Sequence, residues 1–235
     1  MTATETSPPP VRALVFDVFG TLVDWRSGIA EAFRASGAPG DPEDLADAWR
    51  ARYRPIIGDI NDGRRPWGDF DELHGETLDD LLAERGAEVP TEARRRLVSA
   101  WHRLDPWPDV RSGLESLRRA RPVAMLSNGH TALLVELARH GDLRFDCVLS
   151  AELAHAYKPA AEVYRTAARL LRVQPAELML VAAHPWDLQG AREAGLATAF
   201  VDRPLEYGPG SPPREDPGAG ESVGDLHELA ARLDR

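Results

Sequence analysis

The sequence has one cysteine, one lysine and no apolar run near the roughly 20 residues that a membrane-spanning helix needs. The single cysteine, Cys147, excludes a disulfide framework and a thiolate metal cluster. The N-terminus has no basic segment followed by an apolar stretch, so a secretory signal is not predicted. These features predict a soluble, cytoplasmic protein.

The charge balance is acidic, and its basic side is almost entirely arginine. The chain has 38 acidic and 28 basic residues, and its net charge of −10 argues against a nucleic-acid or anionic-membrane partner. Lysine occurs once, at Lys158, so the other 27 basic residues are arginine. Arginine is planar and always charged, whereas lysine is compact and has a tunable pKa. Lys158 is therefore a candidate for a role that arginine cannot fill, although the count equally allows a leftover surface lysine.

The apolar pattern alternates between strands and helices in the second half of the chain. Short β-rich runs predict buried strands at residues 11–16, 122–126, 145–149, 178–183 and 197–201. Helical patterns separate the later runs, at 110–120, 130–140, 160–172 and 187–194. This alternation predicts an α/β fold, a parallel sheet with helices on both faces.

The stretch between the first two predicted strands has helical patterns only, at 29–35, 42–57, 69–85 and 91–104. It is far longer than the roughly 12 residues that a crossover needs, so we predict an inserted helical domain over residues 25–106. The core domain then comprises 11–24 and 107–235, after a disordered tail at 1–10. Loops are predicted at 58–67 and 203–222, and a final helix at 225–233.

Polar residues follow each of the first four predicted strands. They are Asp17, then Ser127 and Asn128, then Lys158, then His184 with Asp187. Each alone has an ordinary structural explanation, such as a turn residue or a helix cap. Because ligands bind beyond the carboxyl ends of parallel strands, their coincidence predicts an active site at that edge.

Four segments resemble the successive motifs of the haloacid dehalogenase superfamily, in the same order, over about residues 11–205. The segments are Asp17-Val-Phe-Gly-Thr-Leu22, Leu126-Ser-Asn-Gly129, Tyr157-Lys158-Pro159 with Val163-Tyr164, and Trp186-Asp187 with Gly190-Ala-Arg192. They are most similar to the type II 2-haloacid dehalogenase branch. The resemblance implies a Rossmann-like core with a helical cap, where the insert is predicted.

The same motifs separate dehalogenases from the phosphatases of that superfamily. Phosphatases have the pattern D-x-D-x-T, whose second Asp protonates the leaving alkoxide, and usually a second acidic residue in the last motif to bind Mg²⁺. Here the position of that second Asp is Phe19, and the last motif supplies only Asp187. A halide leaves without a proton or a metal, so we predict a hydrolase of 2-haloacids without a cofactor. A small-molecule phosphatase and a non-catalytic protein that binds a carboxylate or a protein partner are the alternatives.

The resemblance implies a role for each matched catalytic position. Asp17 is the nucleophile that forms an ester with the substrate, and Lys158 keeps it ionised. Thr21 fixes the rotamer of Asp17, and Asp187 orients or deprotonates water in the second step. Tyr164 supports the site.

Substrate binding is assigned in the same way. Ser127, with backbone N–H groups at the next helix start, holds the substrate carboxylate, and Asn128 helps receive the halide. Arg50, in the segment Trp49-Arg50, matches the arginine that accepts the halide in the dehalogenases. Arg52 and Arg54 are its competitors and are expected to face solvent or to pair with acids.

Phe19, His184 and Trp186 complete the predicted substrate pocket. The related dehalogenases often carry Tyr in place of Phe19, and Ser and Asn at the positions of Ala182 and His184. Those differences leave the hydrogen bonding around Lys158 open. His184 is a candidate base or donor, and a pH-sensitive structural role is the alternative. Two cap residues, Trp67 and His74, either line the pocket or have structural positions, in the cap core and on a helix surface respectively. A homodimer is a further expectation from the family.

Overall fold

The computed structural model describes residues 9–212, 215 and 218–234. Its centre is a six-stranded, all-parallel sheet with the order β3-β2-β1-β4-β5-β6. The strands are β1 Ala13–Phe16, β2 Val123–Ser127, β3 Cys147–Ser150, β4 Leu178–Ala182, β5 Ala197–Val201 and β6 Glu221–Val223. From β1, strands are added first on one side, through β2 and β3, and then on the other side, through β4, β5 and β6. This is the order of a Rossmann-like core, and it confirms the predicted fold class.

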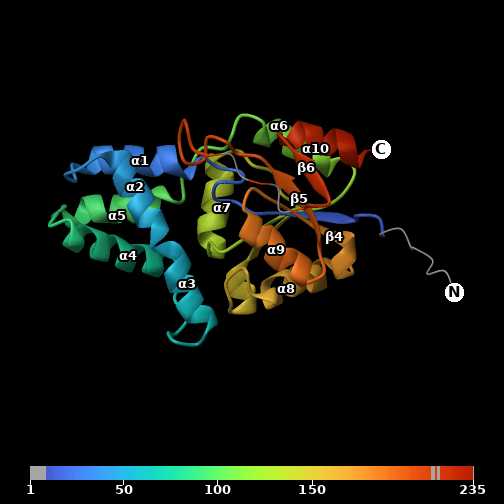
Figure 1. Cartoon of the computed structure of the whole chain (residues 1–235), viewed down its shortest axis with the longest axis horizontal. Helices are drawn as coiled ribbons and strands as arrows, with labels where there is room; N and C mark the ends of the chain where they lie inside the picture. Colours follow the sequence, from blue (N-terminus) through green and yellow to red (C-terminus); the bar gives the residue numbers. More distant parts are fainter. Residues whose placement is uncertain (1–8, 213–214, 216–217, 235) are drawn as a thin grey trace.

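Helices cover both faces of the sheet, so β1, β2 and β4 are buried along their whole length. Figure 1 shows α6 (Val110–Arg118) and α10 (Leu226–Leu233) on one side, and α8 (Ala161–Leu171) and α9 (Pro185–Glu193) on the other. The helix α7 (Thr131–His140) follows β2. Burial on both faces explains why these strands are continuous apolar runs and not alternating ones.

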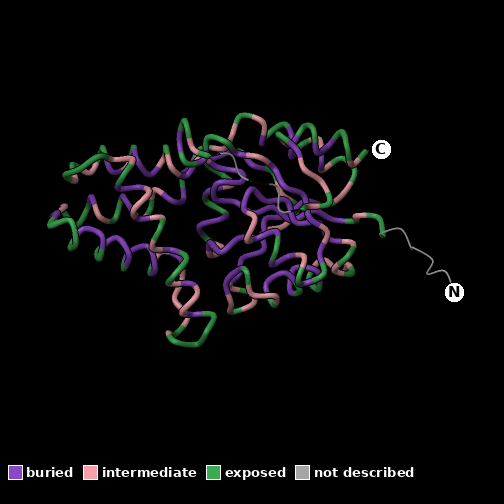
Figure 2. Tube along the Cα trace, viewed as in Figure 1, coloured by how far each residue is buried: buried purple, intermediate pink, exposed green. Residues whose placement is uncertain are grey.

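A block of five helices lies between β1 and β2 in sequence and beside the sheet in space (Figure 1). Its members are α1 Trp25–Ser36, α2 Pro42–Ala51, α3 Tyr53–Asn61, α4 Phe70–Glu84 and α5 Thr91–Ala100. Aspartates cap the first turns of α1, α2 and α4, because their carboxylates accept hydrogen bonds from free backbone N–H groups there. Figure 2 shows buried residues along the inner faces of these helices, where they pack on one another.

Three sequence predictions need correction. The helix predicted at 42–57 is two helices that meet at Arg52, because Pro55 has no N–H to continue the ladder and fits only the first turn of a new helix. The loop predicted at 58–67 therefore starts after Asn61. The loop predicted at 203–222 ends in β6, and it buries Arg203 and Glu206.

The remaining boundaries agree with the predictions to within a few residues. Most of the tail predicted at 1–10 lies outside the described residues, which begin at residue 9. Within the described ranges, no helix combines the length and the apolar character that crossing a membrane requires.

Candidate active site

The first four strands bring the predicted polar residues together at one edge of the sheet. Asp17 directly follows β1, and its backbone N–H donates to the carbonyl of Val181 in β4, 3.0 Å away. The chain then turns at Gly20, whose φ of +85° is in the left-handed region that favours glycine. A Cβ at Gly20 would collide with the carboxylate of Glu206. This position therefore needs glycine for two reasons, and the turn aims the Asp17 side chain into the site.

Lys158 lies between two carboxylates at the centre of the site. Its Nζ donates to Oδ1 of Asp17 at 2.8 Å and to Oδ2 of Asp187 at 2.6 Å. The Lys158 side chain is 1% exposed, so the surface-lysine alternative is wrong. Burial alone would lower the pKa of Lys158, but the two carboxylates outweigh it and hold the pKa above its usual value. The ammonium is therefore permanent at neutral pH.

The nucleophile candidate Asp17 is held as a carboxylate. Burial favours its neutral form, but the charge of Lys158 and the hydrogen bond from His184 prevail and keep the Asp17 pKa well below its ordinary range. Thr21 Oγ1 donates to Oδ2 of Asp17 at 2.7 Å and accepts from the backbone N–H of Ala183 at 3.0 Å. Thr21 therefore connects the Asp17 carboxylate to the backbone that follows β4.

The pKa of Asp187 is shifted in the opposite direction from that of Asp17. Its burial, aided by the charge of Asp17, raises its pKa although Lys158 opposes the shift. Tyr164 donates from its hydroxyl to Oδ1 of Asp187 at 2.6 Å, while Lys158 occupies Oδ2. Both oxygens of Asp187 are therefore engaged in holding the site together.

His184 is placed between Asp17 and a residue that the sequence analysis did not select. Its Nδ1 is 3.0 Å from Oδ2 of Asp17, and its Nε2 is 3.0 Å from Oε1 of Glu206. Burial lowers the His184 pKa, but Glu206 and Asp17 together raise it to about 9. Glu206 is 1% exposed and also accepts from Nε1 of Trp25 at 2.9 Å. Nothing in the sequence marks Glu206, because it lies in a Pro- and Gly-rich segment that favours a surface loop.

Arg50 projects from the end of α2 toward four aromatic rings. Its guanidinium carbon is 4.7 Å from the ring centre of Tyr53, and it lies within 6.0 Å of those of Trp25, Trp101 and Phe19. Among the described residues, its buried Nη1 has no hydrogen-bond partner. An aromatic enclosure keeps this cation poorly solvated and available to an anion.

A cavity of about 220 Å³ opens between the helical block and the core, next to Arg50. Its lining includes Tyr53 from the block and His184 and Trp186 from the start of α9. The ring of Trp186 lies under the guanidinium of Arg54, at 4.2 Å. The structure therefore brings Arg50, His184 and Trp186 to one cavity, whereas Phe19, Ser127 and Asn128 are not among its lining residues.

Ser127 and Asn128 are buried and make contacts within the protein. Ser127 Oγ accepts from the backbone N–H of Gly129 at 3.2 Å. Asn128 Oδ1 accepts from the backbone N–H of Lys158 at 2.8 Å, and its amide nitrogen contacts the hydroxyl of Tyr53. Asn128 thus ties the Lys158 segment to β2 and reaches the helical block.

The remaining predicted residues have mainly packing contacts. Phe19 stacks on Phe70 of α4, with ring centres 5.6 Å apart. Trp67 stacks on Tyr157 at 4.4 Å. His74 is buried and stacks on Trp101 at 4.3 Å, so its placement on a helix surface is wrong. Burial, with the charge of Arg50, holds the His74 pKa well below its usual value, so its ring is neutral.

The two competitors of Arg50 also find partners. Arg52 pairs with Glu84 of α4, with 3.1 Å between Nη1 and Oε1. Arg54 lies over Trp186, as described. Arg50 differs from both in lying within 6.0 Å of four aromatic ring centres while its buried Nη1 has no partner among the described residues.

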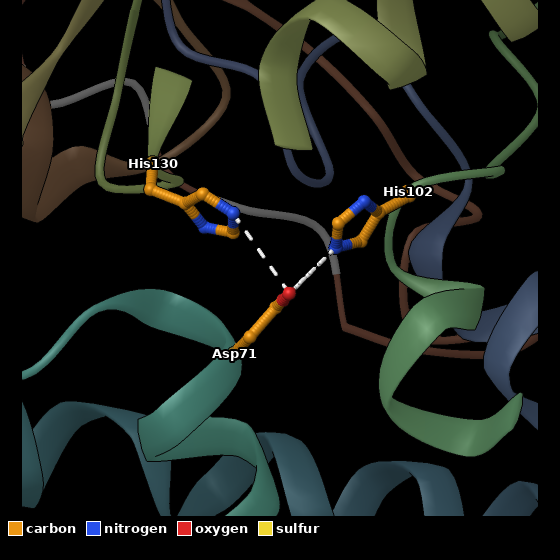
Figure 3. A group of neighbouring side chains, drawn as sticks. All are labelled: Asp71, His102 and His130. Atoms are coloured by element: carbon orange, nitrogen blue, oxygen red, sulfur yellow. Dashed lines mark hydrogen bonds and ion pairs between the residues drawn. The ribbon is translucent and has the colours of Figure 1, made fainter. Parts of the chain in front are cut away.

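A second cluster of titratable groups joins α4 to the start of α7 (Figure 3). Candidate metal-ligand atoms of Asp71, His102 and His130 lie within 4.8 Å of one another. His102 Nε2 is 2.9 Å from Asp71, and its Nδ1 is 2.9 Å from Glu136 of α7. Because both ring nitrogens face carboxylates, the arrangement fits an imidazolium that links the helical block to the core. Spacing in the sequence gave no sign of this cluster.

The arrangement around Asp17 has a definite chemical capacity. A buried carboxylate is held ionised by an ammonium, and its neighbour His184 lines a cavity whose wall also contains the guanidinium-bearing Arg50. At the position of the second Asp of the D-x-D-x-T motif, this chain has Phe19, whose phenyl ring can neither give nor take a proton. The site is therefore suited to nucleophilic displacement of a group that leaves as an anion.

Comparisons with known proteins show which family the sequence and the fold resemble. A family model described as haloacid dehalogenase-like hydrolase matches residues 11–195. The chain is similar to (S)-2-haloacid dehalogenase 1 of Pseudomonas sp. (strain CBS-3), with 33% identity over 210 residues that cover 84% of this chain and 88% of the relative.

Solved structures extend the similarity to nearly the whole chain. The L-2-haloacid dehalogenase PA0810 is 43% identical, with a TM-score of 0.88 and coverage of 95% of this chain and 99% of the other. The L-2-haloacid dehalogenase of Xanthobacter autotrophicus, solved with chloropropionic acid covalently bound, is 28% identical, with a TM-score of 0.82 and coverage of 95% and 98%.

Proposed function

Because the chain belongs to the haloacid dehalogenase-like hydrolase family, we propose that it hydrolyses the carbon–halogen bond of short 2-haloalkanoic acids through an ester on Asp17. The observation that carries this proposal is the Asp17–Lys158–Asp187 cluster in the presence of Phe19. The cluster supplies an ionised nucleophile, and Phe19 removes the proton donor that phosphate esters need. The related Xanthobacter structure, with its covalently bound chloropropionic acid, supports a covalent intermediate.

In the first step, a carboxylate oxygen of Asp17 attacks Cα of the substrate, and the halogen leaves with the bonding electron pair. Displacement at a saturated carbon inverts that carbon, so the product has the opposite configuration. Lys158 and Thr21 hold the carboxylate in place for in-line attack. Since a halide ion is a weak base, this step needs neither a proton donor nor a metal.

Arg50 is the proposed acceptor of the departing halide. Its buried Nη1 and the Nε1 of Trp101 have no hydrogen-bond partner among the described residues. An unpartnered buried donor costs free energy, about 1–3 kcal/mol, unless a ligand satisfies it. A halide between these groups would satisfy both donors while the aromatic rings exclude water.

The substrate carboxylate is assigned to the start of α7. Backbone N–H groups at a helix N-terminus bind anions, and Ser127 and Asn128 lie just before that helix. In the second step, water attacks the carboxyl carbon of Asp17 and releases the 2-hydroxy acid. Asp187 contributes by fixing Lys158, whose charge stabilises the anion that forms on the carbonyl oxygen of the ester.

The wider organisation follows from the same assignment. We infer that residues 25–106 are a cap domain that closes over the edge of the core formed by 11–24 and 107–235, and that Arg50 reaches the site from this cap. Enclosure by a cap would exclude water from the first step. A homodimer and a cytoplasmic location remain predictions from the family resemblance and the sequence.

Halide release from a panel of 2-haloacids tests the proposal. The panel contains both enantiomers of 2-chloropropionate, together with chloroacetate and bromoacetate, each assayed with and without EDTA. We expect halide release from at least one compound, unaffected by EDTA, and none from Asp17→Asn, whose amide is nearly isosteric but a poor nucleophile. Failure to release halide from any of them, with Mg²⁺-dependent hydrolysis of a phosphate ester, would support the phosphatase alternative. Binding of a haloacid without either reaction would support the non-catalytic alternative.

A further inference from the structure

His184 connects the nucleophile to a second buried acid. Its two ring nitrogens are each 3.0 Å from a carboxylate oxygen, Nδ1 from Asp17 and Nε2 from Glu206. All three residues are at most 6% exposed. Glu206 itself accepts a hydrogen bond from the indole N–H of Trp25. Gly20 packs so closely against the Glu206 carboxylate that position 20 has no room for a side chain. The three side chains therefore form a fixed line, Glu206–His184–Asp17.

We propose that His184, oriented by Glu206, is the base that activates water for hydrolysis of the Asp17 ester. This inference rests on the proposed function, and it assigns the second step to residues other than Asp187. Asp187 uses one oxygen to accept from Lys158 and the other to accept from Tyr164, both at 2.6 Å. His184, by contrast, faces the Asp17 carboxylate directly and also lines the cavity, which gives water a route to its ring.

The neighbouring charges explain how His184 can be a proton donor in the resting enzyme and a base once the ester has formed. In the resting enzyme, burial opposes protonation of His184, but Glu206 and the Asp17 carboxylate together raise its pKa to about 9. The imidazolium then donates to Asp17 and helps to hold it ionised. When Asp17 becomes an uncharged ester, one of the two anions is lost and the His184 pKa falls. The proton leaves from Nδ1, because Glu206 retains the proton on Nε2, and Nδ1 gains the lone pair that a base needs.

The hydrolytic step balances with these groups alone. After halide departure, His184 releases one proton to solvent. Water then attacks the carboxyl carbon of Asp17 and passes a proton to Nδ1, so a carbon–oxygen bond forms to the water oxygen. The bond between that carbon and the ester oxygen breaks, and the leaving alkoxide takes the proton from Nδ1 to become the product hydroxyl. The remaining acid proton of Asp17 returns to His184 and restores the carboxylate–imidazolium pair. The net products are the hydroxy acid, halide and one proton.

Two variants separate this role from a structural one. His184→Gln can still donate to Asp17 but is no base, and Glu206→Gln retains the size of the acid without its charge. His140→Gln is the matched control, because His140 lies at the end of α7, is 37% exposed on its side chain and contacts Asp105. Each purified variant is mixed with excess 2-chloropropionate. Halide release in the first turnover, steady-state halide release and the mass of the intact protein are then measured.

We expect His184→Gln to release about one halide per active site and to accumulate the ester, with steady-state turnover reduced about 100-fold or more. Glu206→Gln should accumulate less ester than His184→Gln. Because the imidazolium loses the negative charge beside it, the His184 pKa should fall, and the pH midpoint of the hydrolytic step should move down. A merely structural role of Glu206 would not move that midpoint. His140→Gln should match the unmodified protein.

Several outcomes would overturn the inference. One is hydrolysis of the ester in His184→Gln at the unmodified rate. Another is a His184→Gln variant that releases no halide in the first turnover and forms no ester, which would place His184 in the first step. If His184→Gln fails to fold by circular dichroism, the pH midpoint in Glu206→Gln decides the question, and an unchanged midpoint refutes the proposal. Absence of halide release from the unmodified protein with every 2-haloacid would instead refute the proposed function, so the two failures are distinct.

Discussion

Nζ of Lys158, the only lysine in the chain, lies 2.8 Å from Oδ1 of Asp17, although 141 residues separate the two in sequence. The same ammonium contacts Asp187 at 2.6 Å, and its buried position is available only because parallel strands end at a common edge. A guanidinium at this place would present a broad planar fork in place of a single point charge. The pair is thus the local reason that a lysine persists in a chain that otherwise uses arginine.

Replacement of Lys158 by Met should make Asp17 harder to ionise. Removing the nearest positive charge leaves burial, which raises the Asp17 pKa, opposed mainly by His184. Activity depends on the carboxylate, so the acidic limb of the pH–rate profile should move to higher pH and activity at pH 7 should fall at least about tenfold. Initial rates of halide release between pH 5 and 10 check this prediction. An acidic limb at the unmodified position would contradict the assigned role of Lys158.

Replacement of Arg50 by Lys should slow the first step and spare the second. The variant keeps the charge but loses the planar fork that can present two N–H groups to one halide. We expect the rate of ester formation to fall about 10- to 100-fold, which corresponds to about 1.4–2.7 kcal/mol. Rapid-quench mass spectrometry follows formation and decay of the ester in a single turnover. Arg52→Lys is the control, since Arg52 pairs with Glu84 outside the cavity. Equal slowing of ester decay would argue against a halide-specific role.

Replacement of Phe19 by Asp should not by itself create an effective phosphatase. The variant supplies a carboxylate, but the last motif still has only Asp187, which is committed to Lys158 and Tyr164. A Mg²⁺ site needs several oxygen ligands, and the ammonium competes with the ion for the same carboxylates. Assays with p-nitrophenyl phosphate and Mg²⁺ should show no activity above background. Strong Mg²⁺-dependent turnover would show that the last motif has been misinterpreted.

The cluster around His102 should make stability depend on pH. Burial lowers the His102 pKa, but Asp71 and Glu136 outweigh it and raise the pKa above 6.5. A raised folded-state pKa gives stabilisation that is complete below pH 6.5 and is lost as the pH rises through the folded-state value. Solvent access limits the effect to about 1 kcal/mol or less.

Urea unfolding at pH 5.5 and pH 8.5 measures this contribution. The unmodified protein should lose more stability between these two values than His102→Gln, which has no charge to lose. His140→Gln, at an exposed position, serves again as the control. Identical pH dependence in the unmodified protein and in His102→Gln would mean that the imidazolium does not link the helical block to the core.

The sequence predicts the first five strands, the insert and the polar residues that follow the strands, because these depend on local patterns. Buried parallel strands are apolar runs, and Asp17, Lys158 and Asp187 follow them at positions where topology brings strand ends together. The burial of Glu206 and its contact with His184 cannot be predicted from local sequence patterns. It reaches His184 from a segment whose Pro and Gly content predicts only a loop, so its burial follows from tertiary packing against Gly20 and Trp25.

The sequence analysis also missed two further features. The break between α2 and α3 was predictable in principle from Pro55, but the amphipathic pattern continues through it. The contact between His102 and Asp71 joins residues 31 positions apart on separate elements, where no spacing rule applies.

Isotope labelling of Asp17 tests the central claim most directly. The protein is incubated with a 2-haloacid in H₂¹⁸O, digested, and the peptide that contains Asp17 is weighed by mass spectrometry. Water attacks the enzyme ester and not the substrate carbon, so the account predicts that ¹⁸O enters the carboxylate of Asp17 and that the first product hydroxyl carries an unlabelled oxygen. Label in the product hydroxyl from the first turnover, with none in the protein, would mean direct displacement by water and would contradict a nucleophilic Asp17.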